Sequence, residues 1–370
     1  MPTLIVSFAL ILCLFVAAVP AAAQFKPIKS PEVGTDRTVT FRFMAPGAKE
    51  VSLLREGAMP VPMTKEEGGL WTITVGPLDP DIYGYNFIAD GVPLLDPSNY
   101  WLKTNYLWQQ NMVRVPGADS PWDVADVPHG ALHHHFYKSG VVGDQRDFYV
   151  YTPAGYDGKK KYPVLYLQHG FSDDASGWTI VGQAHVILDN LIAQGRAKPM
   201  IVVMSLGYGA PEIVHAGIAG FGDTELRERN FSKFAQALLT EVIPQVEKDY
   251  KVSRKREDRA IAGLSMGGAE SLLTGLNNLD KFAYVGAFSA GGFRAELPQA
   301  FPNLSDKDNA RIKLLWMACG TEDGLIRPNR DLSAWLKTKG VQHTWIETPG
   351  AHTWMVWRRY LAQLTPLLFR

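Results

Sequence analysis

The sequence predicts two folded regions, a small antiparallel β-sandwich followed by a larger α/β region with a mostly parallel sheet. In the first region, from about residue 33 to residue 107, short strand patterns alternate with period two and no helical period interrupts them. From Tyr149 onward, strands alternate with helical patterns such as 184–193 and 231–246, which is typical of a sheet with helices on both faces. The apolar strand runs lie near Val164, Ile201, Ala260, Tyr284 and Leu314.

The composition is that of a neutral globular protein. The 370 residues include 46% hydrophobic side chains, which is ample for packed cores. Basic and acidic residues balance at 37 each, so the chain has no overall field to attract nucleic acid or an anionic membrane. A neutral polymer or a small neutral molecule fits this balance better as a partner than a polyanion does.

The first residues have the pattern of a secretory leader. The stretch Leu4–Val19 is almost continuously apolar and is followed by Pro20–Gln24, which is rich in alanine. This pattern predicts a signal peptide over residues 1–23, cleaved after Ala23, and a secreted or periplasmic protein with no membrane anchor after cleavage. Because Lys and Arg are missing ahead of the apolar stretch, a retained anchor is the alternative. Cleavage would leave Cys319 as the single cysteine, which excludes an internal disulfide and suits a packing role.

Residues 28–115 are predicted to form the β-sandwich. Gly, Pro and Asp turns separate its strand runs, which are Val39–Phe43, Val51–Leu54, Leu70–Val75 and Tyr83–Ile88. Trp71, Tyr83 and Tyr85 lie at alternating strand positions and are assigned to the core rather than to an exposed stacking surface. Trp101 and Trp108 lie past the last predicted strand, and we expect them to cover the site of the following region.

A linker is predicted over residues 116–128, where turn-forming residues gather. The α/β region, residues 129–370, then opens with a histidine-rich run. On a strand, His133 and His135 share a face while His134 points away, and two histidines do not complete a zinc site. We therefore expect no metal here and interpret the run as an exposed edge strand.

A candidate nucleophile lies in the sequence Gly263-Leu264-Ser265-Met266-Gly267, between the apolar run Ala260–Ala262 and the helix-prone Ala269–Leu273. This is the strand-to-helix setting in which G-x-S-x-G forms a nucleophile elbow. A serine hydroxyl is a poor nucleophile, so it needs a tight turn that exposes it and a base that takes its proton. The flanking glycines relieve crowding in such a turn. Taken alone, the pentapeptide would also fit an ordinary turn.

Partners for Ser265 follow it in the chain order of an α/β-hydrolase, first an acid and then a histidine, each in a loop after a later strand. The apolar run Ile312–Ala318 leads into a turn that contains Asp323. A second run, His343–Glu347, leads into a glycine-containing loop that contains His352. The order favours a hydrolase site over an isolated turn.

The choice among the acids and histidines rests on their surroundings. Asp331 begins an amphipathic helix pattern, which suits a capping or surface role, and Glu322 is the closer rival to Asp323. His343 begins a strand and is interpreted as structural or exposed. His352 is expected to accept the serine proton and later donate it to the leaving group, while Asp323 fixes the imidazole tautomer.

Backbone donors for an oxyanion are expected beside the elbow. The buried-strand run Val164–Gln168 leads into His169-Gly170-Phe171. A turn at this place commonly supplies one N–H of the oxyanion hole, and the residue after the nucleophile supplies the other. We assign the backbone N–H groups of Phe171 and Met266 to this role. His169 is expected to orient the loop by hydrogen bonding rather than to react.

Several of these motifs recur together and in order. They are Pro163–Trp178, Asp189–Ala193, Lys198–Val203, the elbow, the turn Gly320–Asp323 and the run Gly350–Arg358. This set resembles the esterase D superfamily, and most closely the bacterial feruloyl and acetylxylan esterases of plant cell-wall degradation, over residues 130 to 370. The resemblance implies an α/β-hydrolase fold with Ser265, Asp323 and His352 as the catalytic triad.

The resemblance extends to the first region and to the substrate side of the site. Phe43–Val51 and Asp96–Asn99 resemble E-set domains, related to glycogen-binding modules, that precede many such esterases. The stretch Met204–Gly209 replaces an Asn-Gly turn that is frequent in the family, and we expect it to border the substrate cleft. Candidate substrate contacts are Trp178, Tyr208 and Trp354.

The sequence thus predicts a secreted serine carboxylesterase that forms an acyl-enzyme and needs no cofactor. The resemblance implies feruloyl or acetyl esters of plant cell-wall polysaccharide, so a carbohydrate-linked ester, as the substrate. The alternatives are an enterochelin-type siderophore esterase, which also pairs a β-domain with an esterase D domain, and an acyltransferase on the same scaffold. The leader and the absence of a basic excess disfavour the siderophore esterase. A non-catalytic carbohydrate-binding protein would be expected to have a broken triad, and this sequence has all three members.

Overall fold

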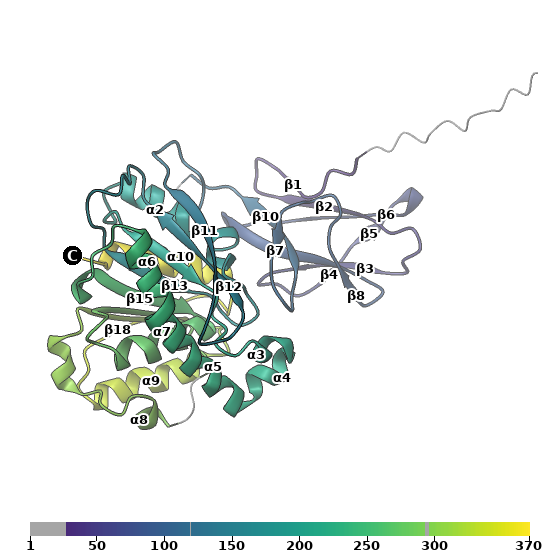
Figure 1. Cartoon of the computed structure of the whole chain (residues 1–370). Helices are drawn as coiled ribbons and strands as arrows, with labels where there is room; N and C mark the ends of the chain where they lie inside the picture. Colours follow the sequence, from purple (N-terminus) through teal and green to yellow (C-terminus); the bar gives the residue numbers. More distant parts are fainter. Residues whose placement is uncertain (1–26, 119, 293–295) are drawn as a thin grey trace, which may run out of the picture.

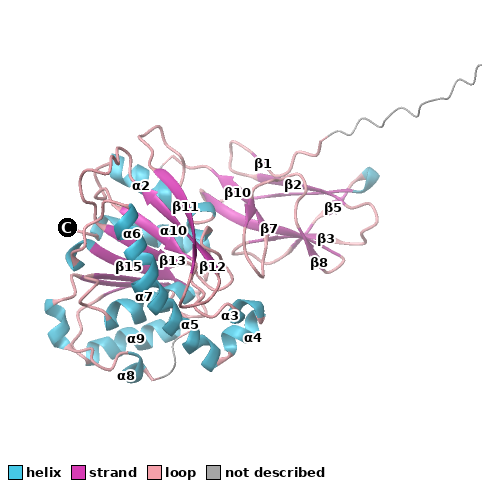
Figure 2. Ribbon diagram, in the orientation of Figure 1, coloured by secondary structure: helices cyan, strands magenta, loops and turns pink. Residues whose placement is uncertain are grey.

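The computed structural model describes residues 27–118, 120–292 and 296–370. A β-rich N-terminal region lies beside a larger region of strands and helices (Figures 1 and 2). The predicted signal peptide, residues 1–23, lies outside the described residues. Among the helices of the described chain, none is both long and apolar enough to cross a membrane.

The N-terminal region contains two antiparallel sheets that share one apolar core. The first sheet has the order β1-β2-β6-β5, and the second has the order β4-β3-β7-β10-β9 with β8 beside β7. Phe41 of one sheet and Tyr85 of the other meet edge to face, with ring centroids 4.7 Å apart. The strands are β1 Glu32–Val33, β2 Val39–Met44, β3 Val51–Arg55, β4 Val61–Pro62, β5 Thr64–Lys65, β6 Leu70–Val75, β7 Asp81–Ala89, β8 Val92–Leu94, β9 Leu102–Lys103 and β10 Gln110–Val115.

The core assignments for this region are confirmed, and one strand was missed. Trp71, Tyr83 and Tyr85 are all buried. Strand β10 pairs with β7 along its length, so the two tryptophans at 101 and 108 precede a central strand instead of following the last one. Its apolar signal is short because Asn111 occupies a buried position, where its side chain bonds the backbone of Asp96 instead of packing.

The α/β region is built on one eight-stranded sheet of order β11-β12-β14-β13-β15-β16-β17-β18. The pairings β11-β12 and β12-β14 are antiparallel and all the others are parallel, as predicted. Consequently the loops after β13, β15, β17 and β18 open at the same edge of the sheet. The strands are β11 Ala131–Lys138, β12 Gln145–Thr152, β13 Val164–Gln168, β14 Ile201–Ser205, β15 Arg259–Leu264, β16 Tyr284–Phe288, β17 Leu314–Gly320 and β18 Thr344–Thr348.

Helices cover both faces of this sheet (Figure 2). Successive residues of a strand point to opposite faces of the sheet, so each face has its own apolar core. Leu165 and Leu167 pack in the core with α1, α2 and α10. Val164 and Tyr166 pack in the core with α5, α6, α7 and α9. A π-helical stretch, Leu238–Val242, joins α5 to α6. The helices are α1 Gly177–Ile180, α2 Ala184–Ala193, α3 Glu212–His215, α4 Gly217–Gly222, α5 Thr224–Ala237, α6 Ile243–Asp249, α7 Ser265–Asn277, α8 Leu297–Ala300, α9 Ile326–Thr338 and α10 Trp354–Leu364.

The histidine-rich run forms β11, the edge strand of the sheet, as predicted. Each central histidine has a protein partner: His133 bonds Thr152, His134 bonds Asp147 and His135 bonds the Tyr250 hydroxyl. Within the described residues, no group of three or more His, Cys, Asp or Glu side chains is arranged to hold a metal ion.

A buried ion pair joins the N-terminal region to helix α10. The Arg358 guanidinium donates to Asp81 Oδ1 from Nε at 3.0 Å and from Nη2 at 2.6 Å, and Nη1 donates to the Val181 carbonyl at 2.8 Å. Both charged side chains are 0% exposed. Arg359, whose side chain is 43% exposed, also donates to Asp81, at Oδ2 and 2.8 Å. The acid is therefore held by two arginines of one helix.

Removing the buried arginine should cost far more stability than removing the exposed one. Arg358→Met leaves Asp81 without its closest counter-charge, and breaking such a pair costs about 3–5 kcal/mol of unfolding free energy. Arg359→Met, the matched control, removes a partly solvated contact worth about 1 kcal/mol or less. Urea unfolding of both variants measures the difference. Equal losses would contradict the assignment of Arg358 as the main link.

Candidate active site

Ser265 occupies a sharp turn between β15 and α7. Its φ of 52° lies in the left-handed region, which is strained for a residue with a side chain and is found at functional turns. The backbone around the turn is crowded, because a Cβ at Gly263 would come within 2.4 Å of the Gly267 carbonyl oxygen. A Cβ at Gly267 would in turn lie 2.3 Å from the His169 carbonyl oxygen. Both glycines of the pentapeptide are thus required for close approach of three chain segments.

The three predicted triad side chains meet at the carboxyl edge of the sheet. His352 Nε2 lies 3.0 Å from Ser265 Oγ, and His352 Nδ1 lies 2.8 Å from Asp323 Oδ2. The serine follows β15, the aspartate follows β17 and the histidine follows β18. The aspartate side chain is 0% exposed whereas the histidine side chain is 36% exposed. The hydrogen-bonded series of side chains therefore begins in the interior at Asp323 and reaches the surface at His352.

The contacts define what each group can do. Asp323 also accepts a hydrogen bond from Leu325 N at Oδ1, 2.8 Å away, which fixes its orientation. Burial alone would raise the pKa of Asp323, but the hydrogen bond and charge interaction with His352, together with hydrogen bonds from Leu325 N and Ser289, outweigh burial and lower it. An ionised Asp323 accepts a hydrogen bond from Nδ1–H, so Nε2 carries no proton and can accept a hydrogen bond from the serine hydroxyl.

The rival residues lie elsewhere. Glu322 accepts a hydrogen bond from Gly350 N at 2.7 Å and so braces the loop that precedes His352. Asp331 lies on the exposed face of α9, in a surface role but not at its N-cap. His343 bonds Ser333 and the Val341 backbone, as expected of a structural histidine. Cys319 is buried and unpaired, which confirms its packing role.

Of the two predicted oxyanion donors, Phe171 lines the same cavity as Ser265, and Met266 directly follows Ser265 in the chain. Phe171 lies in the loop after β13, and Met266 lies in the first turn of α7, where helical N–H groups have no intrahelical acceptor. His169 is buried behind this loop; Gly207 N donates to its Nε2 at 2.9 Å, so Nδ1 must donate to the Gly170 carbonyl at 2.8 Å. His169 therefore orients the loop, as predicted.

A cavity of about 400 Å³ opens over Ser265 and His352. Its wall on the α/β side includes Phe171, Trp354 and Trp357, and the Trp357 ring packs edge-on against the His352 imidazole at 4.7 Å between centroids. The opposite wall comes from the N-terminal region and consists of Glu56, Lys103, Asn105 and Trp108. The cavity is thus a shared product of both regions.

Two predicted substrate contacts require correction. Trp178 is 0% exposed and its indole N–H donates to the Gln168 carbonyl, so it lies in the core below the cavity. Tyr208 is 2% exposed and its hydroxyl donates to the Asp173 carbonyl, and the surrounding stretch Met204–Gly209 is likewise absent from the cavity wall. Both aromatics are held by buried hydrogen bonds that face inward. Trp354 does line the cavity.

Of the two tryptophans expected to cover the site, Trp108 lines the cavity and Trp101 does not. The sequence analysis did not identify the other cavity residues of the N-terminal region or Asp173. Asn105 donates to Asp173 Oδ1 at 2.8 Å across the junction, and Tyr106 N donates to the Ser172 carbonyl at 2.8 Å. Trp354 N, at the start of α10, donates to Glu56 Oε1 at 3.0 Å. These partners are separated by 66 to 298 positions, which is why no local pattern pairs them.

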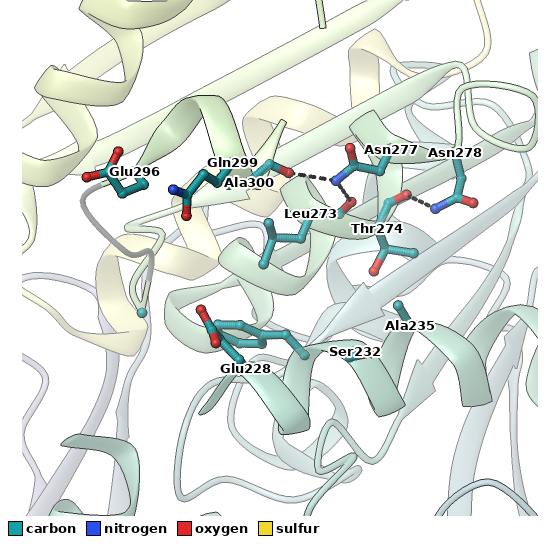
Figure 3. A pocket seen from close by; sticks show the side chains of 12 residues that line it. Glu228, Ser232, Ala235, Leu273, Thr274, Asn277, Asn278, Glu296, Gln299 and Ala300 are labelled. Carbon is teal, nitrogen blue, oxygen red and sulfur yellow. Dashed lines mark hydrogen bonds between the residues drawn. The ribbon is translucent and has the colours of Figure 1, made fainter. Parts of the chain in front are cut away.

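A second hollow, of about 370 Å³, lies between α5, α7 and α8 (Figure 3). Leu273, Thr274 and Asn277 of α7 line one side, and Glu228 and Ser232 of α5 line the other. Asn277 bonds the carbonyls of Leu273 and Ala300. Leu273, Thr274 and Asn277 belong to the last turns of α7, at the opposite end of the helix from Ser265. The second hollow is therefore separate from the cavity over Ser265.

The comparison with protein families decides the classification. The family model "Esterase", described as "Putative esterase", matches residues 139–368. This chain belongs to the esterase family. The match includes the serine, the aspartate and the histidine of the site, together with the loop after β13.

Individual relatives agree with the family. The chain is 32% identical over 351 residues to an endo-1,4-beta-xylanase/feruloyl esterase of Xylanibacter ruminicola. The aligned part covers 92% of this chain and 46% of that protein, so this chain spans about half the relative's length. A ferulic acid esterase of Anaeromyces mucronatus, solved with ferulic acid, has a TM-score of 0.60 at 25% identity, covering 68% of this chain and 96% of that one. The enterobactin esterase of Shigella flexneri has a TM-score of 0.64 at 19% identity over 89% of this chain and 92% of its own, a likeness of fold alone.

The buried carboxyl of Asp173 should give the esterase-family protein a measurable pH dependence of stability. Burial raises the pKa of Asp173 to about 6 in the folded state, whereas an unfolded aspartate has a pKa of about 3.9. The folded state then holds the proton more firmly, so this contribution stabilises at low pH and is lost as the pH rises from about 4 to above 6. Asp173→Asn removes this titration and should gain about 2–3 kcal/mol relative to the native chain between pH 4 and pH 7. Urea unfolding at each pH measures this gain, and a constant difference would contradict it.

Proposed function

We propose that this protein is a serine carboxylesterase that hydrolyses its substrate through an acyl-enzyme. The observation that carries the proposal is the continuous hydrogen-bonded chain from Asp323 through His352 to Ser265, at the mouth of a cavity. An activated nucleophile is recognised by this relation between nucleophile, base and orienting acid. Membership of the esterase family supports the same reaction class.

In the proposed mechanism Ser265 Oγ attacks the ester carbonyl carbon while its proton passes to His352 Nε2. The carbonyl oxygen becomes an oxyanion that accepts hydrogen bonds from the backbone N–H groups of Phe171 and Met266. The resulting imidazolium, stabilised by Asp323, donates its proton to the leaving hydroxyl oxygen as the C–O bond breaks. Water then attacks the acyl-enzyme, His352 takes a proton from that water, and collapse of the second intermediate returns the proton to Ser265.

The proposed substrates are feruloyl or acetyl esters linked to plant cell-wall polysaccharide. The xylanase/feruloyl esterase relative and the ferulic acid esterase structure support this class. We further propose that the N-terminal region is an E-set β-sandwich and that the protein is exported, with the apolar leader Leu4–Val19 in support. An exported esterase would meet a polymeric substrate that cannot enter a cell.

Siderophore hydrolysis is the second candidate, because the enterobactin esterase fold matches both regions of the chain. The charges of the cavity argue against it: Lys103 is the single basic side chain in the described lining besides His352, and Glu56 and Asp173 line it as well. Such a wall offers little to a multiply anionic catecholate–iron complex. Hydrolysis of methyl ferulate, acetylated xylan and ferric enterobactin, compared with one purified preparation, distinguishes the two candidates. Product analysis with an added sugar acceptor tests for acyl transfer.

Substitution of the triad should abolish turnover without unfolding the protein. Ser265→Ala removes the nucleophile and should lower kcat by at least about 10⁴-fold, and it should end labelling by a fluorophosphonate. Asp323→Asn favours the wrong imidazole tautomer and should lower kcat by about 10⁴-fold. Glu322→Gln, the neighbouring control, keeps the acceptor for Gly350 N and should stay within about threefold of the native rate. Full activity in Ser265→Ala would rule out the mechanism.

The N-terminal wall should contribute binding rather than chemistry. Trp108 is 50% exposed on the cavity wall, and Trp108→Ala should raise KM for a feruloyl ester by about tenfold with kcat little changed, because apolar contact area is lost. Tyr100→Ala, which changes an exposed aromatic of the same region outside the cavity lining, is the control. Steady-state kinetics on methyl ferulate measure both. If KM is equal in the two variants, Trp108 does not contact the acyl group.

A further inference from the structure

Helix α10, which follows the proposed catalytic histidine, is not capped by its own residues. It begins at Trp354, two positions after His352, and the side chain of its N-cap residue Thr353 makes no capping hydrogen bond. The first N–H groups of a helix need acceptors from outside the helix. The acceptor for Trp354 N is Glu56 Oε1 at 3.0 Å, which belongs to the N-terminal region.

Glu56 is itself held in place by its own sheet. Its Oε2 accepts a hydrogen bond from Gly84 N of β7 at 3.2 Å, and its backbone N–H donates to the Gly84 carbonyl at 2.7 Å. One carboxylate therefore bridges a strand of the N-terminal region and the first turn of α10. A carboxylate at a helix N-terminus also has a favourable interaction with the helix dipole.

Packing supports the same turn. Met355, the second residue of α10, packs against the apolar core of the N-terminal sheets. Gly57 allows this approach, because a Cβ there would lie 2.9 Å from Met355 Cε. One turn later Arg358 forms the buried pair with Asp81. The N-terminal half of α10 is thus fixed by a region that contributes no member of the triad.

We propose that Glu56 is a positioning residue for His352, acting through the Trp354 amide. This inference rests on the proposed serine esterase function. Loss of the bridge frees the first turn of α10 and with it the loop that presents the imidazole to Ser265. The N-terminal region then takes part in catalysis through the histidine, in addition to forming a wall of the cavity.

The test compares Glu56→Ala with Glu56→Gln. The alanine variant loses the acceptor, and kcat per active site, counted by fluorophosphonate titration, should fall about tenfold or more on a small ester such as methyl acetate, because small misplacement of a catalytic group is costly. KM should change less than about twofold, because the position of the imidazole affects the chemical step and not the affinity for the ester. Glutamine retains an oxygen that can accept from Trp354 N and should restore most of kcat.

Asp36→Ala is the matched control. Asp36 is also a carboxylate of the N-terminal region that accepts a backbone hydrogen bond, from Thr38 N at 3.1 Å, and its hydrogen-bond partner is a residue of its own region. It should leave kcat unchanged. Circular dichroism and thermal unfolding establish that all the variants are folded at the assay temperature.

Three results would overturn the inference. A native kcat per titrated site in Glu56→Ala means that the bridge is not needed. A raised KM with native kcat means that Glu56 contacts substrate instead, and an equal loss in Glu56→Gln means that the charge rather than the hydrogen bond matters.

A readout other than activity separates this inference from the proposed function. The proton between His352 Nδ1 and Asp323 should give a downfield ¹H NMR signal, assigned by its loss in His352→Gln. That signal should be altered in Glu56→Ala and kept in Glu56→Gln. If the native protein hydrolyses no ester and is not labelled, the proposed function fails, and the NMR comparison alone decides the positioning role.

Discussion

The placement of helix α10 is the constraint on which the rest of the site depends. Its body packs on the sheet, while its first two turns are held by Glu56 and Asp81 of the N-terminal region. The loop that ends at Thr353 therefore has one fixed end, and Glu322 braces its start through Gly350 N. Because the imidazole is partly exposed, this bracing must replace the packing that holds a buried side chain in place.

The turn at Ser265 is also held by neighbouring segments of the chain. A parallel sheet brings the ends of β13, β15, β17 and β18 to one edge, and the glycines at 263 and 267 let three backbones cross there without side chains between them. The strained turn at Ser265 is tolerated because both adjoining elements are buried. Behind it, His169 is fixed as the Nδ1–H tautomer by two backbone contacts, which makes the loop of Phe171 rigid.

The accuracy of the sequence-based predictions follows the range of the interactions involved. The turn at Ser265, the strands of the parallel part, and the position of Asp323 rather than Glu322 beside His352 could be predicted because each depends on a strand and the loop that follows it. Trp178 and Tyr208 were assigned to the cleft from their proximity to motifs, yet both turn inward because buried carbonyl oxygens accept their polar hydrogens. Strand β10 was missed because a buried asparagine breaks its apolar pattern.

What the sequence alone determined is the set of local elements and the choice of candidate site residues, since period, turn chemistry and chain order are properties of short segments. The tertiary structure alone decided which surfaces face each other. Glu56 meets Trp354 N across 298 positions, and Asn105 meets Asp173 across 68. Such pairs leave no trace in local pattern, because a single carboxylate or amide is chemically compatible with many partners until packing selects one.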